Sequence, residues 1–174
     1  MSHATPPDST EFAPYYETYV SKVPSGDIRR TLREQRDAAI GFLRGIPGTR
    51  ATFRYAEGKW DLGEVLGHIN DTERVFAFRG WWFARGLEGE LPSFDQDVAV
   101  ARAATGERTW HDLIDEFEAI RSSTLHLFDA LPDEAWLRRG VASGNRFSVR
   151  ALAWIAAGHV EHHLRLIRER YLAV

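Results

Sequence analysis

The chain has 174 residues, of which 44% are hydrophobic and 27% charged, and its 22 basic and 25 acidic side chains give a formal net charge of −3 with histidine neutral. This length and composition are typical of one globular domain, and the slight negative charge argues against electrostatic binding to nucleic acid or to anionic membranes. The absence of cysteine excludes disulfides, thiolate metal ligands and a cysteine nucleophile, so a metal ion must be held by His, Asp or Glu.

The amino-terminal residues 1–14 are expected to form a flexible lead, because they are mostly small, polar or proline. They lack the basic start and apolar stretch of a secretory signal, and no apolar run approaches the ~20 residues of a membrane span. We therefore expect a cytoplasmic protein with no membrane partner, in which residues 15–174 form a single domain.

Four segments further along the chain show the apolar period of amphipathic helices. The first follows Asp27 and ends before Pro47, and the second begins at Asp61 and runs to about residue 85. The third begins at Thr109 and stops before Pro132, and the fourth covers about residues 148–171. No alternating strand pattern of any length is present, although residues 132–147 are compatible with a short hairpin. These features predict an all-α helical bundle.

The fourth expected helix places two histidines on its apolar face. At about 100° per residue, His159 and His163 lie about 40° apart and one turn apart among apolar side chains. Each ring could be an ordinary core histidine with one hydrogen bond, but two neutral imidazoles on an apolar face favour a shared ion. His162 lies at the edge of this face and is the weaker candidate.

A third ligand must come from another helix, and His68 flanks the apolar face of the second one. His111 and His126 point away from the apolar face of the third helix, and His3 belongs to the lead. Three histidines from two helices form the open ligand set that is typical of catalytic zinc and similar divalent ions. Neither the H-E-x-x-H pattern nor the Glu-x-x-His pattern of di-iron bundles is present.

Two carboxylates are candidates for orientation or proton handling at this site. Glu73 lies at the centre of the apolar face of the second helix, where it either forms a buried ion pair with Arg79 or Arg121 or orients a ligand imidazole. Asp97 follows Phe94 in the long connection of residues 86–108, and it either hangs over the mouth of the bundle or is simply solvated.

Four stretches of the sequence resemble a known family. They are KWDLGEVLGHI at residues 59–69, DTERVFAFR at 71–79, FDQD at 94–97 and GHVEHH at 158–163. They resemble the DinB-like superfamily of metal-binding four-helix bundles, which includes the YfiT-type bacillithiol transferases and mycothiol-dependent enzymes.

The resemblance implies an antiparallel four-helix bundle with long crossover loops, commonly a homodimer. It also implies that His68, His159 and His163 bind a divalent ion, zinc or nickel in the first place and iron as a further option. Bacillithiol or mycothiol would be the small-molecule thiol co-substrate. A surplus of aromatic residues is consistent with an oligomer, namely Tyr15, Tyr16, Trp81, Trp82 and Trp154.

The resulting hypothesis is a divalent-metal-dependent thiol S-transferase that conjugates a small thiol to electrophilic metabolites or xenobiotics. One alternative is a metal-dependent hydrolase that uses metal-bound water, and another is a non-catalytic stress-response binding module that keeps the bundle. Metal content and thiol dependence discriminate between these three. No residue set in the sequence identifies the thiol.

Overall fold

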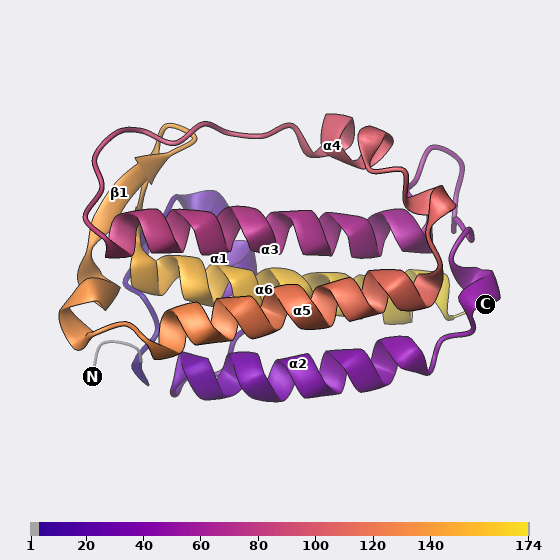
Figure 1. Ribbon diagram of the computed structural model, residues 1–174, viewed down its shortest axis with the longest axis horizontal. Coiled ribbons are helices and arrows are strands. Elements are labelled where there is room, and N and C mark those ends of the chain that lie inside the picture. Colours follow the sequence, from indigo (N-terminus) through magenta and orange to yellow (C-terminus); the bar gives the residue numbers. More distant parts are fainter. Residues whose placement is uncertain (1–3, 174) are drawn as a thin grey trace.

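The computed structural model describes residues 4–173 of the chain. Within this range the helices are α1 Glu17–Val20, α2 Ile28–Arg44, α3 Leu62–Ala84, α4 Gln96–Arg102, α5 Trp110–Asp129 and α6 Val149–Leu166, and the strands are β1 Arg139–Ala142 and β2 Asn145–Ser148. The four long helices α2, α3, α5 and α6 lie side by side as a bundle (Figure 1). The predicted all-α four-helix architecture is thus confirmed. None of the helices in the described part of the chain has the length and apolarity needed to cross a bilayer.

The connection between α3 and α5 determines the topology of the bundle. It crosses the full length of the molecule and carries α4 on its way, so that α3 and α5 run in the same direction (Figure 1). α2 is antiparallel to α3, and α6 is antiparallel to α5. Helix α3 packs against both α6 and α5, and α6 also packs against α1 and α2.

The starts of the long helices follow from local capping. Asp27 accepts a hydrogen bond from the Arg29 amide at the start of α2, and Ser148 accepts one from the Ala151 amide at the start of α6. Helices α3 and α5 begin with reciprocal capping boxes, in which Asp61 pairs with Glu64 and Thr109 with Asp112. The predicted starts of all four long helices are confirmed. They can be predicted from the sequence because capping depends on side chains within a few residues of the helix end. A π-helical turn at Ile167–Tyr171 follows the end of α6.

The short hairpin formed by β1 and β2 closes one end of the bundle (Figure 1). Leu91, in the crossover, donates its amide to the Val141 carbonyl and accepts from the Ser143 amide. These bonds fix the first part of the crossover against the hairpin.

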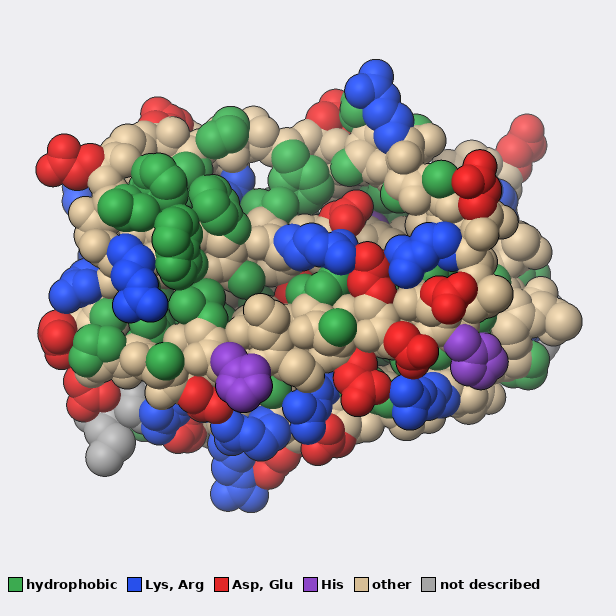
Figure 2. Space-filling view, in the orientation of Figure 1, with side chains coloured by type: hydrophobic (Ala, Val, Ile, Leu, Met, Phe, Trp, Pro, Cys, Tyr) green, Lys and Arg blue, Asp and Glu red, His purple; other side chains and the backbone are tan. Residues whose placement is uncertain are grey.

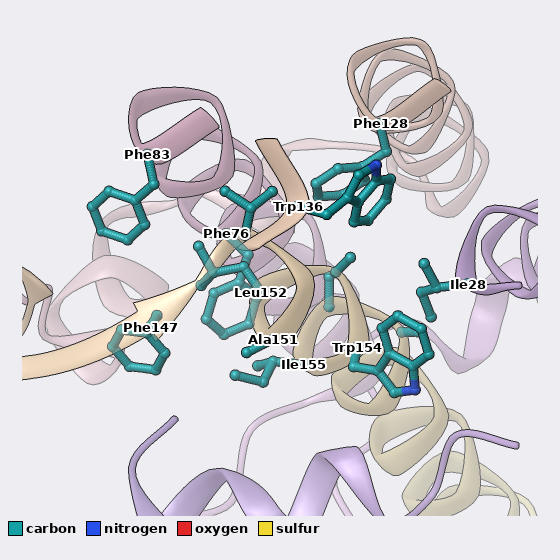
Figure 3. Close-up of a cluster of buried hydrophobic side chains, with 14 of the residues drawn as sticks. Ile28, Phe76, Phe83, Phe128, Trp136, Phe147, Ala151, Leu152, Trp154 and Ile155 are labelled. Carbon is teal, nitrogen blue, oxygen red and sulfur yellow. The ribbon is translucent and has the colours of Figure 1, made fainter. Parts of the chain in front are cut away.

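The apolar core next to the hairpin is built from large side chains of several elements (Figure 3). Trp136 stacks on Phe128 of α5 with ring centroids 5.5 Å apart. Trp154 has no exposed surface, so its inclusion among the surplus surface aromatics was wrong. Its place on the inner side of α6 explains this burial, whereas Tyr15 and Trp81 remain 66% and 38% exposed.

The described part of the lead differs from the expected flexible segment. Asp8 caps a short helical turn at Ser9–Glu11, and the Glu11 carboxylate is buried at the start of α6. It accepts a hydrogen bond of 2.6 Å from the Ser148 hydroxyl and pairs with the Arg150 guanidinium. These partners lie far away in sequence, which is why composition alone suggested disorder. His3 lies outside the described residues.

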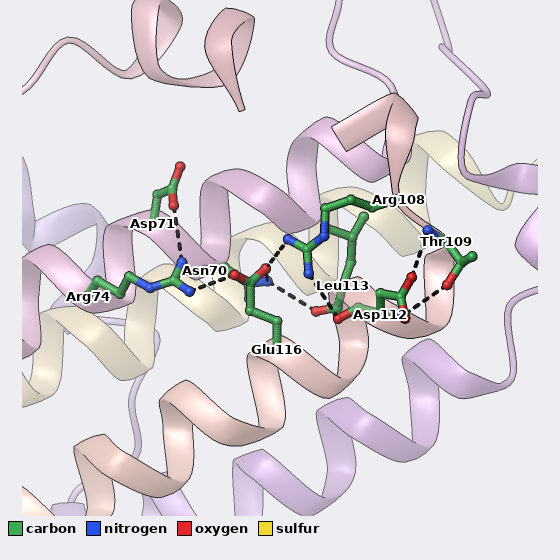
Figure 4. A network of polar contacts seen from close by, with 8 residues as sticks. All are labelled: Asn70, Asp71, Arg74, Arg108, Thr109, Asp112, Leu113 and Glu116. Carbon is green, nitrogen blue, oxygen red and sulfur yellow. Dashed lines mark hydrogen bonds and ion pairs between the residues drawn. The ribbon is translucent and has the colours of Figure 1, made fainter. Parts of the chain in front are cut away.

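A polar network joins α3 to α5 on the side of the crossover (Figure 4). The Glu116 carboxylate accepts from Asn70 at 2.9 Å, from Arg74 at 2.6 Å and from Arg108 at 2.6 Å. Burial acts to raise the pKa of Glu116, but these donors outweigh it and the pKa is lowered. The network links α3 to α5 in one register. It therefore helps to set the position of His68 along the bundle axis.

Candidate metal centre

Three histidines meet where α3 packs against α6. His68 comes from α3, and His159 and His163 come from successive turns of α6. The Nε2 atom of His159 lies 3.1 Å from the Nε2 atom of His68 and 3.1 Å from that of His163. The side chains are only 4%, 4% and 7% exposed. They form a group whose possible ligand atoms all lie within 4.8 Å of one another.

Hydrogen bonds among the rings cannot satisfy this arrangement. A neutral imidazole carries one N–H and one lone pair, so the Nε2 atom of His159 can serve only one of its two neighbours at a time. The Nδ1 atom of His163 is buried and has no hydrogen-bond partner among the described residues. A single cation between the three Nε2 atoms would engage every lone pair at once. Tetrahedral zinc, with Zn–N bonds of about 2.0–2.1 Å, sets its nitrogens about 3.4 Å apart, close to the spacing found here.

The protonation states also suit a cation. Burial, followed by the nearby His162, lowers the pKa of His68 to about 4. Burial, followed by His68, lowers the pKa of His163 to about 3, and burial lowers that of His159 well below its ordinary value. The three rings are therefore neutral near pH 7, and neutral imidazole is the form that binds metal ions.

Neighbouring side chains hold the rings in place. The Thr72 hydroxyl lies 3.4 Å from Nδ1 of His68, and by accepting from an Nδ1–H it would leave the Nε2 lone pair free for a metal ion. Trp60 lies against His68 with ring centroids 4.9 Å apart, and Tyr19 lies against His159 at 5.4 Å. Sequence reasoning did not assign these three residues to the site, although the spacing of four between His68 and Thr72 was a usable signal.

Two cavities reach the histidines. The first has a volume of about 280 Å³ and is lined by His68 and His159, by tyrosines of the amino-terminal segment and, in the crossover, by Ser93, Phe94 and Gln96. The second, of about 250 Å³, is lined by His163, Trp60 and Asp97. Small molecules can therefore approach the cluster from outside.

Glu73 contacts an arginine rather than the three histidines. Its two carboxylate oxygens accept from Nε and Nη2 of Arg121 at 2.7 and 3.0 Å, and both side chains are buried. Of the two partners considered from the sequence, Arg121 is the one that pairs with it and Arg79 is not. Among the described residues, no hydrogen bond joins Glu73 to a histidine, so the contacts are those of the ion-pair alternative.

The remaining candidates occupy more exposed positions. Asp97 lies in the first turn of α4, is exposed, and reaches the cluster only as part of the wall of the second cavity. His162 is half-buried, with its ring 5.0 Å from that of His163, and does not belong to the cluster. His111 and His126 are exposed on α5, as expected.

Comparisons with known proteins agree with this fold. YfiT from Bacillus subtilis, described as a probable metal-dependent hydrolase with an unusual four-helix bundle topology, superposes with a TM-score of 0.70 at 13% identity over 97% of this chain and 95% of its own. A mycothiol-dependent maleylpyruvate isomerase superposes with a TM-score of 0.67 at 13% identity over 83% of this chain. The matched region is 61% of the isomerase, so the chain spans about three fifths of that protein. Among curated proteins no match was found.

The sequence itself matches a family model over most of its length. Residues 31–167 match the model of the DinB superfamily, a range that includes α3, the crossover and the three clustered histidines. Because this match covers well over half of the chain, the protein belongs to the DinB superfamily.

Proposed function

We propose that His68, His159 and His163 bind one divalent metal ion, zinc or nickel in the first place, and that the protein is a metal-dependent enzyme. The observation that carries the proposal is the meeting of three buried, neutral Nε2 atoms beside a cavity. Three protein ligands leave a coordination position open, which is typical of catalytic rather than structural zinc sites.

The reaction that we propose is transfer of a small thiol, bacillithiol or mycothiol, to an electrophilic metabolite or xenobiotic. When bound, a divalent ion lowers the pKa of a thiol or water in its open position and so supplies a nucleophile near neutral pH. No Asp or Glu of the described chain lines the 280 Å³ cavity. A thiol, with a free pKa of about 8.5, ionises with less help from a base than water, with a pKa of about 15.7, and hydrolysis commonly uses a base to activate water. The fold shared with a mycothiol-dependent isomerase supports the same choice.

A metal-dependent hydrolase is the second candidate, and one observation favours it. Asp97 and His163 line the same cavity of about 250 Å³, so a carboxylate is available on that side of the cluster for proton handling. YfiT, which has the same fold, is described as a probable metal-dependent hydrolase. In this reaction Asp97→Asn would remove activity, whereas a thiol transfer in the larger cavity would tolerate it.

The metal assignment is tested by elemental analysis of purified variants. We expect His68→Ala, His159→Ala and His163→Ala each to lose the ion, whereas His162→Ala, from the same turn of α6, keeps most of it. Equal loss in all four would show that the ligand set is misassigned. A wild-type protein purified without metal, and unable to take it up, would favour the non-catalytic binding module.

The reaction is tested with a model electrophile in the presence and absence of bacillithiol or mycothiol. Turnover that requires the thiol and is lost in His159→Ala supports the transferase. Cleavage of esters or amides without any thiol would support the hydrolase.

The expected homodimer also remains a proposal, and an apolar surface supports it. Hydrophobic side chains gather over one end of α3 (Figure 2), where Phe78, Trp81 and Leu87 are 48%, 38% and 41% exposed. The rings of Phe78, Trp81 and Trp82 contact one another with centroids 5.8–6.1 Å apart. Light scattering on Trp81→Glu tests whether a dimer forms through this surface.

A further inference from the structure

Arg79 is a buried cation on the wall of the larger cavity. It follows His68 by eleven residues on α3, which returns it to within about 20° of the same helical face. Its side chain is only 3% exposed, and it lines the 280 Å³ cavity together with His68 and His159. The metal-dependent reaction as proposed gives this arginine no role.

The protein contacts of Arg79 are neutral. One guanidinium nitrogen, Nη2, donates to the Pro92 carbonyl at 2.9 Å and to the Ser143 hydroxyl at 2.8 Å. Burial lowers the pKa of Arg79, and the group that opposes this effect is the Tyr16 hydroxyl rather than a carboxylate. Within the described residues no ion pair reaches it.

The other buried arginine shows what this chain does when a guanidinium has only a structural role. Arg121 is 0% exposed, and both nitrogens of one edge donate to the carboxylate of Glu73. A buried charge without a counterion is costly, so a partner is normally provided. Among the described residues Arg79 has no such carboxylate partner, and its side chain borders a cavity instead.

The surroundings of Arg79 define the kind of anion that fits. Among the described residues that line the cavity, Arg79 is the single lysine or arginine, and none is an aspartate or glutamate. Much of the remaining wall is aromatic, with Tyr15, Tyr16, Phe76 and Phe94. One positive charge matches a carboxylate better than a phosphate group, which carries about −1.5 to −2 at neutral pH. Aromatic walls suit an apolar body attached to that carboxylate.

We propose that Arg79 binds the carboxylate of an organic acid in this cavity. That the acid is the electrophilic substrate rests on the proposed function, because the same cavity reaches His68 and His159. The Cα atoms of residues 68 and 79 are separated by about 16 Å along α3, and side chains on a helix lean toward its amino-terminal end. The reacting atom and the carboxylate are therefore several bonds apart in the substrate.

The test uses metal-free protein and simple probes in isothermal titration calorimetry. Benzoate carries the carboxylate on an aromatic body, benzamide has the same shape without the charge, and inorganic phosphate is an anion without an apolar part. We expect the wild type to bind benzoate at least tenfold more tightly than benzamide or phosphate. Arg79→Gln should weaken benzoate binding at least tenfold, since charge-assisted bonds to guanidinium are lost.

Two further variants separate binding from structure. Arg79→Lys keeps the charge but not the planar fork and should bind benzoate with intermediate affinity. Arg146→Gln removes an exposed arginine of β2 that does not line the cavity, and its benzoate affinity should stay within about threefold of wild type. Circular dichroism melting shows whether each variant is folded, and the comparison of benzoate with benzamide needs no variant.

The proposal is overturned if benzamide or phosphate binds the wild type as tightly as benzoate, or if folded Arg79→Gln binds benzoate unchanged. Because no metal or thiol is present, this result is independent of the catalytic proposal. If the wild-type protein shows no thiol-dependent turnover but still binds benzoate, the proposed reaction is refuted and the carboxylate site stands.

Discussion

The buried carboxylate of Glu73 and the guanidinium of Arg121 form a pair whose energy depends on both members being present. The pair joins α3 to α5, and Arg121 also donates to the Gln35 side chain at 2.8 Å on α2. Removal of one charge from such a pair leaves the other uncompensated in the interior. The structural contribution of Glu73 can therefore be separated from a catalytic one.

For Glu73→Gln we expect the free energy of unfolding to fall by about 3–5 kcal/mol while metal content is unchanged. The physical reason is that the amide keeps the shape but leaves Arg121 without its counterion. Denaturant unfolding and elemental analysis of the folded variant measure the two effects. Glu118→Gln is the matched control, because its ion pair with Arg44 on the surface is 46–50% exposed and worth at most about 1 kcal/mol. Loss of metal from folded Glu73→Gln would instead assign it the role of orienting a ligand imidazole.

The clustered histidines should make the metal-free protein sensitive to mild acid. The folded-state pKa is about 4 for His68 and about 3 for His163, whereas an unfolded histidine has a pKa of about 6.5. Below pH 6.5 the unfolded chain therefore binds more protons than the folded one, and stability falls as the pH falls toward 4. The limiting slope is about 1.4 kcal/mol per pH unit for each histidine.

Denaturant unfolding of metal-free protein at pH 7, 6 and 5 measures this dependence. His68→Gln should reduce the pH dependence of the free energy of unfolding by the contribution of one histidine, at most about 1.4 kcal/mol per pH unit. Equal stability at all three pH values would contradict the neutral, buried state of the rings.

At the scale of elements, the approach of α1 to α6 depends on a missing side chain. A Cβ atom at Gly158 would lie 2.1 Å from the Tyr19 carbonyl oxygen and 2.5 Å from its carbonyl carbon. The contact involves backbone on both sides, so no side-chain rotation can relieve it. Tyr19 in turn packs its ring against His159, the residue next to this glycine.

We expect Gly158→Ala to destabilise the protein by about 1–3 kcal/mol, since α1 must move away from α6. Gly41→Ala is the control, because a methyl group on this exposed glycine of α2 would meet nothing within 4 Å and alanine should stabilise the helix by about 0.5–1 kcal/mol. Thermal unfolding of both variants measures the difference. A Gly158→Ala protein as stable as wild type would show that α1 is not held at this contact.

The sequence predicts those parts of the fold that local chemistry decides. Asp61 and Thr109 mark the starts of α3 and α5 because capping acts over a few residues. The helical period likewise places His159 and His163 on the inner side of α6. The pairing of Glu73 with Arg121 could not be predicted, because it depends on the register of α3 against α5.

Contacts between residues far apart in the sequence could not be predicted either, because they depend on how the elements pack. The burial of Glu11 depends on Ser148 and Arg150, more than a hundred residues away. The cavity next to Arg79 forms only when the crossover and the hairpin turn meet α3, at Pro92 and Ser143. Neither arrangement leaves a periodic signal in the sequence.

At the scale of the whole molecule, the three histidines lie between two apolar clusters. The α6 residues up to Ala157 belong to the cluster near the hairpin, and those from Val160 onward belong to the cluster at the opposite end. Apolar packing between α3 and α6 is thus interrupted where His68 and His159 meet. Because each cluster buries apolar side chains from all four long helices, the bundle should fold without metal, unlike small domains that depend on a structural zinc.

Metal binding should nevertheless stabilise the folded state, since the unfolded chain does not bring His68 to the histidines of α6. At a free zinc concentration 100 times the dissociation constant, the gain is about 2.7 kcal/mol, or an increase in melting temperature of roughly 5–10 °C for a chain of this size. Calorimetric melting of chelator-treated protein with and without zinc measures it. His163→Ala should show no increase and His162→Ala the full one. An unfolded metal-free protein would mean that the clusters cannot hold the bundle alone, and an unchanged melting temperature in the wild type would mean that the three rings do not form a metal site.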